Sequence, residues 1–340
     1  MKLRAMSLVL AAAAVFPAVA SVDNLSLLGT PYGWQSRTDF QWNLQGLNDG
    51  SASFDGHYHG YATADGPVDG NYYILWEETK TVQTVRWFTS QQATTRGLTA
   101  FTLWSLNDGA DPALEASWTK LGDYDVPDKQ FLSVSLPAAV RTRAIKLSYT
   151  NQTNPLTGEF EMYDQLLTPL AVTVSRDHAS PSAYGDIGNA VDGNMFSTYG
   201  STGGLGGNGF VELELDGEQA VGGLHIYFRV QSGYYAAPSA FTIRAWDADA
   251  NDGDGGWSDT LLADVTGWAS NASMFSLDFP AGFSTQKIRL DITGPREATN
   301  LPGGSFGLHE IYLYAPVTVP EPVTMSLLAL GGLALLRRRS

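Results

Sequence analysis

The sequence predicts an all-β fold built from two tandem β-sandwiches. Between residues 21 and 315 no long stretch has a helical period, and short alternating runs of β-branched and aromatic residues recur instead. Gly is abundant, at 36 of 340 residues, whereas only 16% of residues are charged. This balance favours turn-rich β structure over exposed amphipathic helices.

Individual strands can be predicted from alternation. Residues 210–215 (FVELEL) alternate apolar and acidic side chains, as a half-buried strand should. Residues 224–228, 241–244 and 287–292 follow the same rule. Residues 215–218 (LDGE) predict a turn between the first two of these strands.

The strand pattern occurs twice, which predicts a domain duplication. Residues 133–150 align without gaps to 276–293, with seven of 18 positions identical. Residues 100–103 match 240–243, and 158–163 match 307–312, in the same order. The alternative, chance similarity between β-rich segments, would have to produce all three matches in sequence. We therefore expect sandwiches over residues 21–168 and 169–316, with insertions in the loops.

The first twenty residues predict a secretory signal peptide. Lys2 and Arg4 precede an apolar run over residues 6–16, and Ala18 and Ala20 form a small-residue cleavage site before Ser21. The alternative is a membrane anchor, but the run is shorter than the roughly 20 residues that span a bilayer. Export and cleavage by signal peptidase are the expectation.

The last residues carry the most specific motif of the chain. An apolar run over residues 323–336 lies between two short motifs. The segment before it is Val319, Pro320, Glu321 and Pro322, and the residues after it are Arg337, Arg338 and Arg339. This tail, residues 317–340, resembles the PEP-CTERM sorting signal of Gram-negative bacteria, in which the membrane protease exosortase removes the tail. The resemblance implies a hydrophobic helix that holds the chain briefly in the membrane, and a final place at the cell surface or in the extracellular matrix. A plain tail anchor or a buried helix is the alternative.

Charge and cysteine content exclude several classes of protein. The formal net charge is −15, which disfavours nucleic-acid binding. Removing residues 1–20 and 321–340 leaves 15 basic and 34 acidic residues, a net charge near −19. The chain has no Cys, so it can form no disulfide and no thiolate metal site.

Motifs in the second copy resemble the discoidin, or coagulation-factor type C, family. These are the string over residues 189–194 (NAVDGN), the strand over 210–215 and the closing Glu-Ile-Tyr at 310–312, and the first copy has a corresponding Asp-Gly turn at residues 48–50. The resemblance implies the galactose-binding-like jelly roll, an eight-stranded antiparallel sandwich.

The same resemblance implies a structural calcium in each copy. In copy two it assigns Asp192, Asn194, Thr198 and Glu310 to the ion, and in copy one Asp49 and Glu161. Calcium takes six to eight oxygen ligands, which such loops can supply. The alternative is that the aspartates serve turns and the glutamates are solvated strand residues. A second acidic segment, residues 247–256, is interpreted as a solvated hairpin loop in preference to a calcium loop.

Loop aromatics and polar neighbours are the candidate sugar ligands. Aromatic rings stack on pyranose faces, while imidazole, guanidinium and amide groups bind hydroxyls. The candidates are His57, Tyr58, His59 and Tyr61 in copy one, and Tyr199, Arg229, Tyr234 and Tyr235 in copy two. The alternative is packing within the sandwiches, and we expect most of the nine tryptophans to be core residues.

The sequence favours binding over catalysis. It contains no zinc-protease motif and no phosphate-binding loop. We expect a protein that binds an exopolysaccharide or another glycan. The alternatives are a structural matrix protein without a ligand pocket and, third, a polysaccharide-active enzyme, since two placed carboxylates suffice for a glycosidase.

Overall fold

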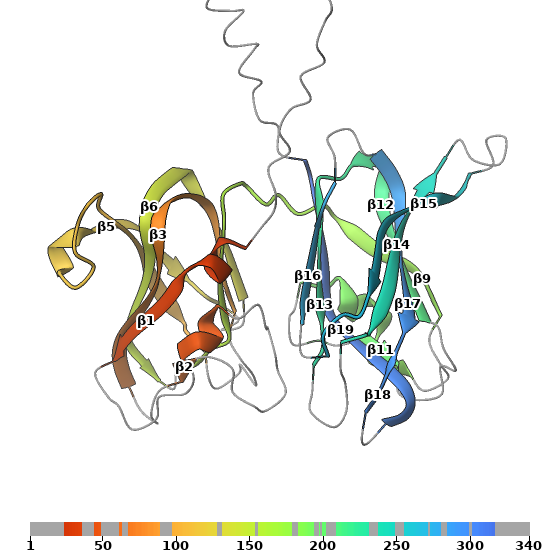
Figure 1. Cartoon of the computed structure of the whole chain (residues 1–340), viewed down its shortest axis with the longest axis horizontal. Coiled ribbons are helices and arrows are strands. Elements are labelled where there is room, and N and C mark those ends of the chain that lie inside the picture. The colour runs from red at the N-terminus through yellow and green to blue at the C-terminus, as the bar shows by residue number, and fades with distance from the viewer. Residues whose placement is uncertain are drawn as a thin grey trace, which may run out of the picture. The chain divides into compact units, whose positions relative to one another are not determined.

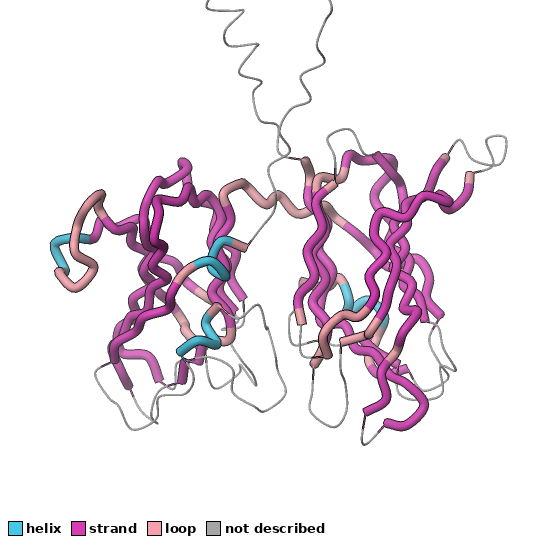
Figure 2. Tube along the Cα trace, viewed as in Figure 1, coloured by secondary structure: helices cyan, strands magenta, loops and turns pink. Residues whose placement is uncertain are grey.

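The computed structural model of the chain describes residues 24–35, 44–48, 61–62, 67–88, 97–127, 131–153, 156–178, 183–193, 197, 199–201, 209–230, 237–248, 255–270, 273–279, 284–298 and 301–316. Within Val22–Val317, which form one compact unit, most of these residues lie in strands (Figure 2). The helices described are single 3₁₀ turns: η1 (Leu25–Leu28), η2 (Leu44–Leu47), η3 (Glu115–Ser117) and η4 (Ile187–Ala190). None of these helices is long and apolar enough to span a membrane. The predicted signal peptide and sorting tail lie outside the described residues.

The first sandwich is made of antiparallel strands in the order β1-β3-β6-β4-β5, with β8 paired to β3 and a separate pair β2-β7. Its strands are β1 (Thr30–Gln35), β2 (Tyr61–Ala62), β3 (Pro67–Phe88), β4 (Ala100–Leu106), β5 (Trp118–Asp125), β6 (Phe131–Thr153), β7 (Leu156–Thr157) and β8 (Glu159–Tyr163).

Two long strands supply both layers of this sandwich. β3 and β6 pair along most of their length, but the register shifts between Leu75 and Lys80, where an exposed polar run, Glu77 to Thr79, interrupts the alternation. Such shifts bend a strand pair strongly, and both strands curve over at this end (Figure 1). The second halves of β3 and β6 thus pack with β8 over the first halves, enclosing a core that includes Trp76 and Trp87.

The second sandwich has two sheets, β10-β11-β19-β13-β16, with β18 paired to β19, and β15-β14-β17-β12-β9. Its strands are β9 (Val172–His178), β10 (Ala183–Tyr184), β11 (Tyr199–Ser201), β12 (Gly209–Ala220), β13 (Gly223–Phe228), β14 (Ala240–Asp247), β15 (Gly256–Thr266), β16 (Met274–Asp278), β17 (Ser284–Gly294), β18 (Arg296–Ala298) and β19 (Leu301–Tyr314). Its own core includes Phe228, Phe241 and Ile311.

The all-β prediction is confirmed, and the aligned segments take corresponding places. Residues 133–150 lie within β6, and residues 276–293 span β16 and β17. The single strand β3 likewise corresponds to the two strands β12 and β13. The predicted boundary at residue 168 falls between β8 and β9 and stays a prediction, because both halves belong to one compact unit.

The turn predicted at residues 215–218 is wrong, because the structure has a bulge inside a strand there. Residues 215–218 do not separate two strands; they form an irregularity inside β12, where Gly217 adopts a φ of 79° and the pairing register shifts between Glu214 and Gln219. The chain leaves the sheet only at residues 221–222. An Asp-Gly pair at positive φ suits a bulge as well as a turn, so the local sequence does not distinguish them.

Candidate functional site

Two predicted calcium ligands meet at one end of the second sandwich. Asp186 begins η4 by accepting a hydrogen bond from Gly188 N at 2.8 Å. Beyond η4, Gly193 takes a φ of 75°, which turns the loop so that its N–H donates to Oε2 of Glu310 at 2.8 Å. Asp192, just before this glycine, accepts a hydrogen bond from Ser197 Oγ at 2.8 Å.

The electrostatics of this carboxylate pair favour a cation. Burial and the neighbouring Asp192 together raise the pKa of Glu310 to about 8, against the opposing hydrogen bonds from the N–H groups of Gly193 and Ile311. A cation would offset both the burial and the repulsion, and carboxylate oxygens are the donors that calcium prefers. Asn194 and Thr198 lie outside the described residues, and the described part of the chain holds no group of three or more metal-binding His, Asp or Glu. The donors present therefore fit calcium, and the complete ligand set stays a prediction.

Arg229 and the imidazole of His309 lie at the same end of the sandwich. Nδ1 of His309 donates to the carbonyl of Ser197 at 3.3 Å, since a carbonyl can only accept. Burial, with a smaller contribution from the positive charge of Arg229, lowers the pKa of His309 to about 3, against the opposing hydrogen bond to Ser197. Arg229, just after β13, is partly exposed and donates its backbone N–H to Gly307 O at 2.8 Å. The predicted ligand residues Tyr234 and Tyr235 follow Arg229 in the chain and lie outside the described residues.

Tyr199 is a core residue, contrary to the prediction that it contacts a ligand. Its side chain is 1% exposed and packs edge-on against Phe306, with the ring centroids 6.2 Å apart. The alternation of β11 directs this ring between the sheets, and a buried ring offers no face to a sugar.

The first copy is less fully described at its predicted loops. Asp49, His57, Tyr58 and His59 lie outside the described residues, and only the backbone of Tyr61, in β2, is described.

Glu161, the other predicted calcium ligand of copy one, is 0% exposed and accepts hydrogen bonds from Tyr163 OH at 2.8 Å and Tyr227 OH at 3.1 Å. Its Oε2 also lies 4.0 Å from Arg86 Nη1. Burial raises the pKa of Glu161, while Arg86 and the two tyrosines oppose the shift. The carboxylate is thus engaged by side chains, and its pairing with Asp49 around calcium stays a prediction.

Arg86 is the centre of this buried polar cluster. Its guanidinium donates to Tyr227 OH at 3.1 Å and to Tyr314 OH, and stacks over the rings of Tyr312 and Tyr314. Arginine, glutamate, histidine and tyrosine together would suit catalysis, but Arg86, Glu161 and His225 are all 1% exposed or less. No substrate can reach such a cluster in this conformation, so its role is structural.

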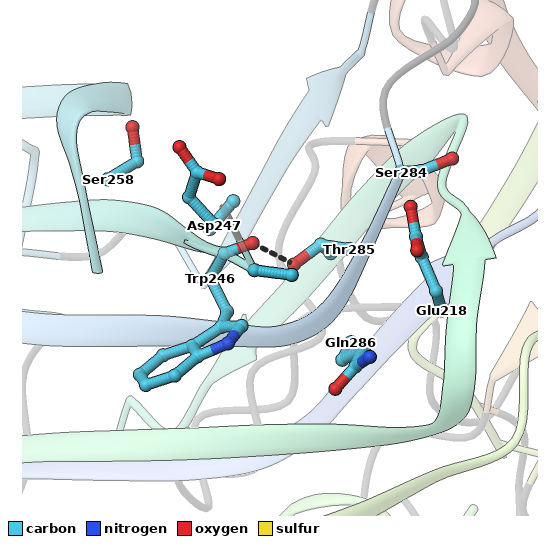
Figure 3. A pocket seen from close by; sticks show the side chains of 9 residues that line it. Glu218, Trp246, Asp247, Ser258, Ser284, Thr285 and Gln286 are labelled. Carbon is cyan, nitrogen blue, oxygen red and sulfur yellow. Dashed lines mark hydrogen bonds between the residues drawn. The ribbon is translucent and has the colours of Figure 1, made fainter. Parts of the chain in front are cut away.

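The second sandwich has a polar hollow of about 340 Å³ where β14 ends and β17 begins. Figure 3 shows its side chains, which include Trp246, Asp247, Ser258, Thr285 and Gln286. Thr285 Oγ1 donates to Trp246 O at 2.9 Å, fixing the hollow's floor. Asp247 begins the predicted acidic loop, most of which lies outside the described residues.

Sequence reasoning missed the exposed tryptophans. Trp76 and Trp87 are core residues as predicted, at 1% and 0% exposure, but Trp34 is 56% exposed and Trp104, Trp246 and Trp257 are only partly buried. The signal was available in Tyr32-Gly33-Trp34, because residues two apart in a strand share one face.

Comparisons with known proteins find similarity to solved structures alone. No protein-family model matches this sequence, and a search of curated proteins finds no match. Among solved structures, a fucolectin from striped bass (Morone saxatilis) serum is 15% identical, with 86% of this chain and 98% of that chain covered and a TM-score of 0.35. The tandem CBM32-1 and CBM32-2 domains of Clostridium perfringens ZmpB are 9% identical, with 84% and 92% covered and a TM-score of 0.32. Allantoicase from Saccharomyces cerevisiae is 13% identical, with 86% and 92% covered and a TM-score of 0.32. At these identities and TM-scores, neither a family nor a ligand follows from the similarity.

Proposed function

We propose that this protein is an exported carbohydrate-binding protein that holds an exopolysaccharide or another glycan in the loops at one end of its second sandwich. The observation that carries this proposal is the gathering of Arg229, His309 and the Asp192–Glu310 pair at that end. The partly exposed Arg229 can donate hydrogen bonds to sugar hydroxyls and the exposed Asp192 can accept them, while Glu310 and His309, at 1% and 2% exposure, hold the loops from within.

Calcium has a supporting role in this proposal. Bound between Asp192 and Glu310, it would tie the loop after η4 to β19 and so order the end that faces the ligand. Asn194 and Thr198 would supply further oxygens. The discoidin-like identity of the sandwiches is part of the same proposal.

Export and sorting are proposed from the two chain ends. The Pro-Glu-Pro segment, the apolar run after it and the three terminal arginines support recognition by exosortase, with the membrane as a temporary partner. We expect Glu321→Ala to leave the tail attached, which a shift in electrophoretic mobility of the surface fraction would report. An unchanged mature size in that variant would rule out this sorting route.

The binding proposal is tested with the compact unit Val22–Val317 on a glycan array. We expect hits that fall on Arg229→Ala or Tyr235→Ala, with His57→Ala probing the first copy. Absence of hits together with retention in the matrix fraction would instead support the structural alternative. Release of reducing ends from a polysaccharide, lost when an acidic pair is replaced, would support the enzyme alternative.

A further inference from the structure

The first sandwich has an outward sheet face that the predicted loop sites do not include. In β3, Tyr72 and Ile74 are 0% exposed and point into the core, so Asn71 and Tyr73 lie on the opposite face. In β1, Tyr32 pairs with Tyr73 and Trp34 pairs with Asn71, which places both exposed rings on that outward side.

Two rows of side chains cross this face from strand to strand. The pairing register continues from Tyr73 to Lys146 on β6 and then to Trp104 on β4. A second row runs from Asn71 to Ser148 on β6, Thr102 on β4 and Asp123 on β5. The first row is mainly aromatic, and the second, which begins at Trp34 on β1, continues with amide, hydroxyl and carboxylate groups.

The aromatic side chains form a platform with free ring surface. Tyr32 stacks on Tyr73 at 5.1 Å with 15° between the planes, and Tyr73 contacts Trp118 at 5.3 Å. Tyr32 is 41% exposed and Trp34 is 56% exposed, although both are large rings in a regular strand. Apolar rings held this way in water cost free energy unless a partner covers them.

Two hollows lie on this outward face. The first, about 420 Å³, is lined by Tyr32, Trp34, Asn71 and Lys146 on the sheet and by Pro112 and Glu115 at its wall. A second hollow of about 220 Å³ is lined by Ser148, Thr102 and Asp123 on the same face. Lys146 and Ser148 are two apart on β6, so the two hollows adjoin and can hold more than one sugar ring.

Lys146 and Lys120 on this face are each paired with a carboxylate. Lys146 Nζ lies 3.3 Å from Glu115 Oε2 and 4.5 Å over the ring of Trp118. Lys120 Nζ lies 2.6 Å from Asp123 Oδ2, and Asp123 also accepts from Thr102 Oγ1 at 2.7 Å. Asp125, which also lines the second hollow, adds a negative charge, so this face disfavours an anionic ligand.

The second sandwich provides an internal comparison. In the alignment of the two copies, Arg289 corresponds to Lys146 and Arg244 corresponds to Trp104. Both arginines form ion pairs on the equivalent face of the second sandwich. Arg289 Nη1 lies 3.0 Å from Glu212 Oε1, and its guanidinium covers the ring of Phe210 at 3.8 Å. The sandwich fold therefore does not require exposed rings at these positions, and the platform of the first sandwich needs another explanation.

We infer that the outward face of β1, β3, β6, β4 and β5 binds the interior of a neutral polysaccharide chain. Pyranose rings stack on Trp34 and Tyr32, while Asn71, Ser148 and Thr102 exchange hydrogen bonds with their hydroxyls. The site shares its ligand class with the proposed function but uses none of the loop residues, so either can hold without the other.

Affinity electrophoresis of Val22–Val317 in gels containing hydroxyethylcellulose, galactomannan or alginate tests this inference. We expect at least one of the two neutral polymers to retard the protein and the polyanion alginate not to. Trp34→Ala should weaken that retardation by about tenfold in Kd, since a large ring contact is lost, and Asn71→Ala should weaken it too. Trp257→Ala is the matched control on the second sandwich, and unchanged thermal melting shows that each variant folds.

Each outcome decides between the sites. Loss of retardation with Trp34→Ala and its persistence with Arg229→Ala support the platform, whatever the glycan array reports. Loss with Arg229→Ala alone overturns the platform and leaves the loop site standing. The inference is also overturned if neither neutral polymer retards the parent protein, or if Trp34→Ala instead converts a dimer to a monomer in sedimentation, which would make a second copy the occupant.

Discussion

Nη1 of Arg86, on β3, lies 3.2 Å from Nδ1 of His225, on β13, with both side chains closed to solvent. A guanidinium can only donate, so Nδ1 accepts and the proton of the neutral imidazole is on Nε2. Burial lowers the pKa of His225 well below its usual 6.5, and the positive charge of Arg86 lowers it further. The imidazole is therefore neutral in the folded protein.

This relationship predicts a loss of stability in mild acid. The unfolded state binds a proton near pH 6.5 and the folded state does not, so stability falls as pH decreases below 6.5 and is unaffected above it. Each pH unit below that point should cost about 1.4 kcal/mol through this histidine. Urea unfolding of Val22–Val317 between pH 7.5 and pH 5 measures the slope.

His225→Gln is the matched variant, because its amide oxygen can still accept from Arg86. The slope of the variant should be smaller by about one proton. The tyrosines that face His225, which are Tyr163, Tyr227 and Tyr314, have pKa values raised by burial and do not titrate in this range. Equal slopes in parent and variant would show that folding does not lower the pKa of His225.

Arg86 and Glu161 should be energetically coupled. Replacing one partner of a buried ion pair leaves the other charge uncompensated, so Arg86→Met should destabilise the protein by about 3–5 kcal/mol. Glu161→Gln in that background removes the stranded carboxylate and should recover part of the loss. A double-mutant cycle from urea unfolding gives the coupling, and strictly additive effects would contradict a direct pair.

The strands were predictable because their evidence is local. Residues 210–215 and 287–292 alternate with period two, and both lie in strands of the second sandwich. The Arg86 cluster was not predictable, because its members come from β3, β8, β13 and β19, and only the folded chain brings them together. Glu161 illustrates the difference, since its place in the final strand of copy one suggested calcium and its tertiary partners are Arg86, Tyr163 and Tyr227.

The candidate site was predictable only in part. Asp192 and Glu310 were paired by a family resemblance, and the structure places both at one end of the second sandwich. Tyr199 and the tryptophans were assigned by residue type, which does not say which face of a strand points outward. Register settles that question: the pairing of Tyr32 with Tyr73 identifies the outward face of the first sandwich.

The exposed and buried tryptophans should separate in stability measurements. Trp34, at 56% exposure, leaves no cavity when truncated, so Trp34→Ala should change the free energy of unfolding by less than about 0.5 kcal/mol. Trp87, at 0% exposure, fills the first core and donates from Nε1 to Thr157 Oγ1 at 3.0 Å. Trp87→Ala should cost about 3–5 kcal/mol in the same urea titration. A comparable loss from Trp34→Ala would mean that its ring supports the fold.

Calcium should stabilise the protein through Glu310. If the ion binds only the folded state, calcium at about 100 times its Kd adds about 2.7 kcal/mol to the free energy of unfolding, and EDTA removes this increment. Glu310→Gln keeps the size of the side chain and an acceptor for the N–H of Gly193 but removes the charge, so the calcium response should disappear while the variant still folds. Glu161→Gln is the parallel variant of the first copy, and calcium stabilisation that survives Glu310→Gln but falls with Glu161→Gln would move the site there. No shift of the melting midpoint between calcium and EDTA in the parent protein would exclude both sites.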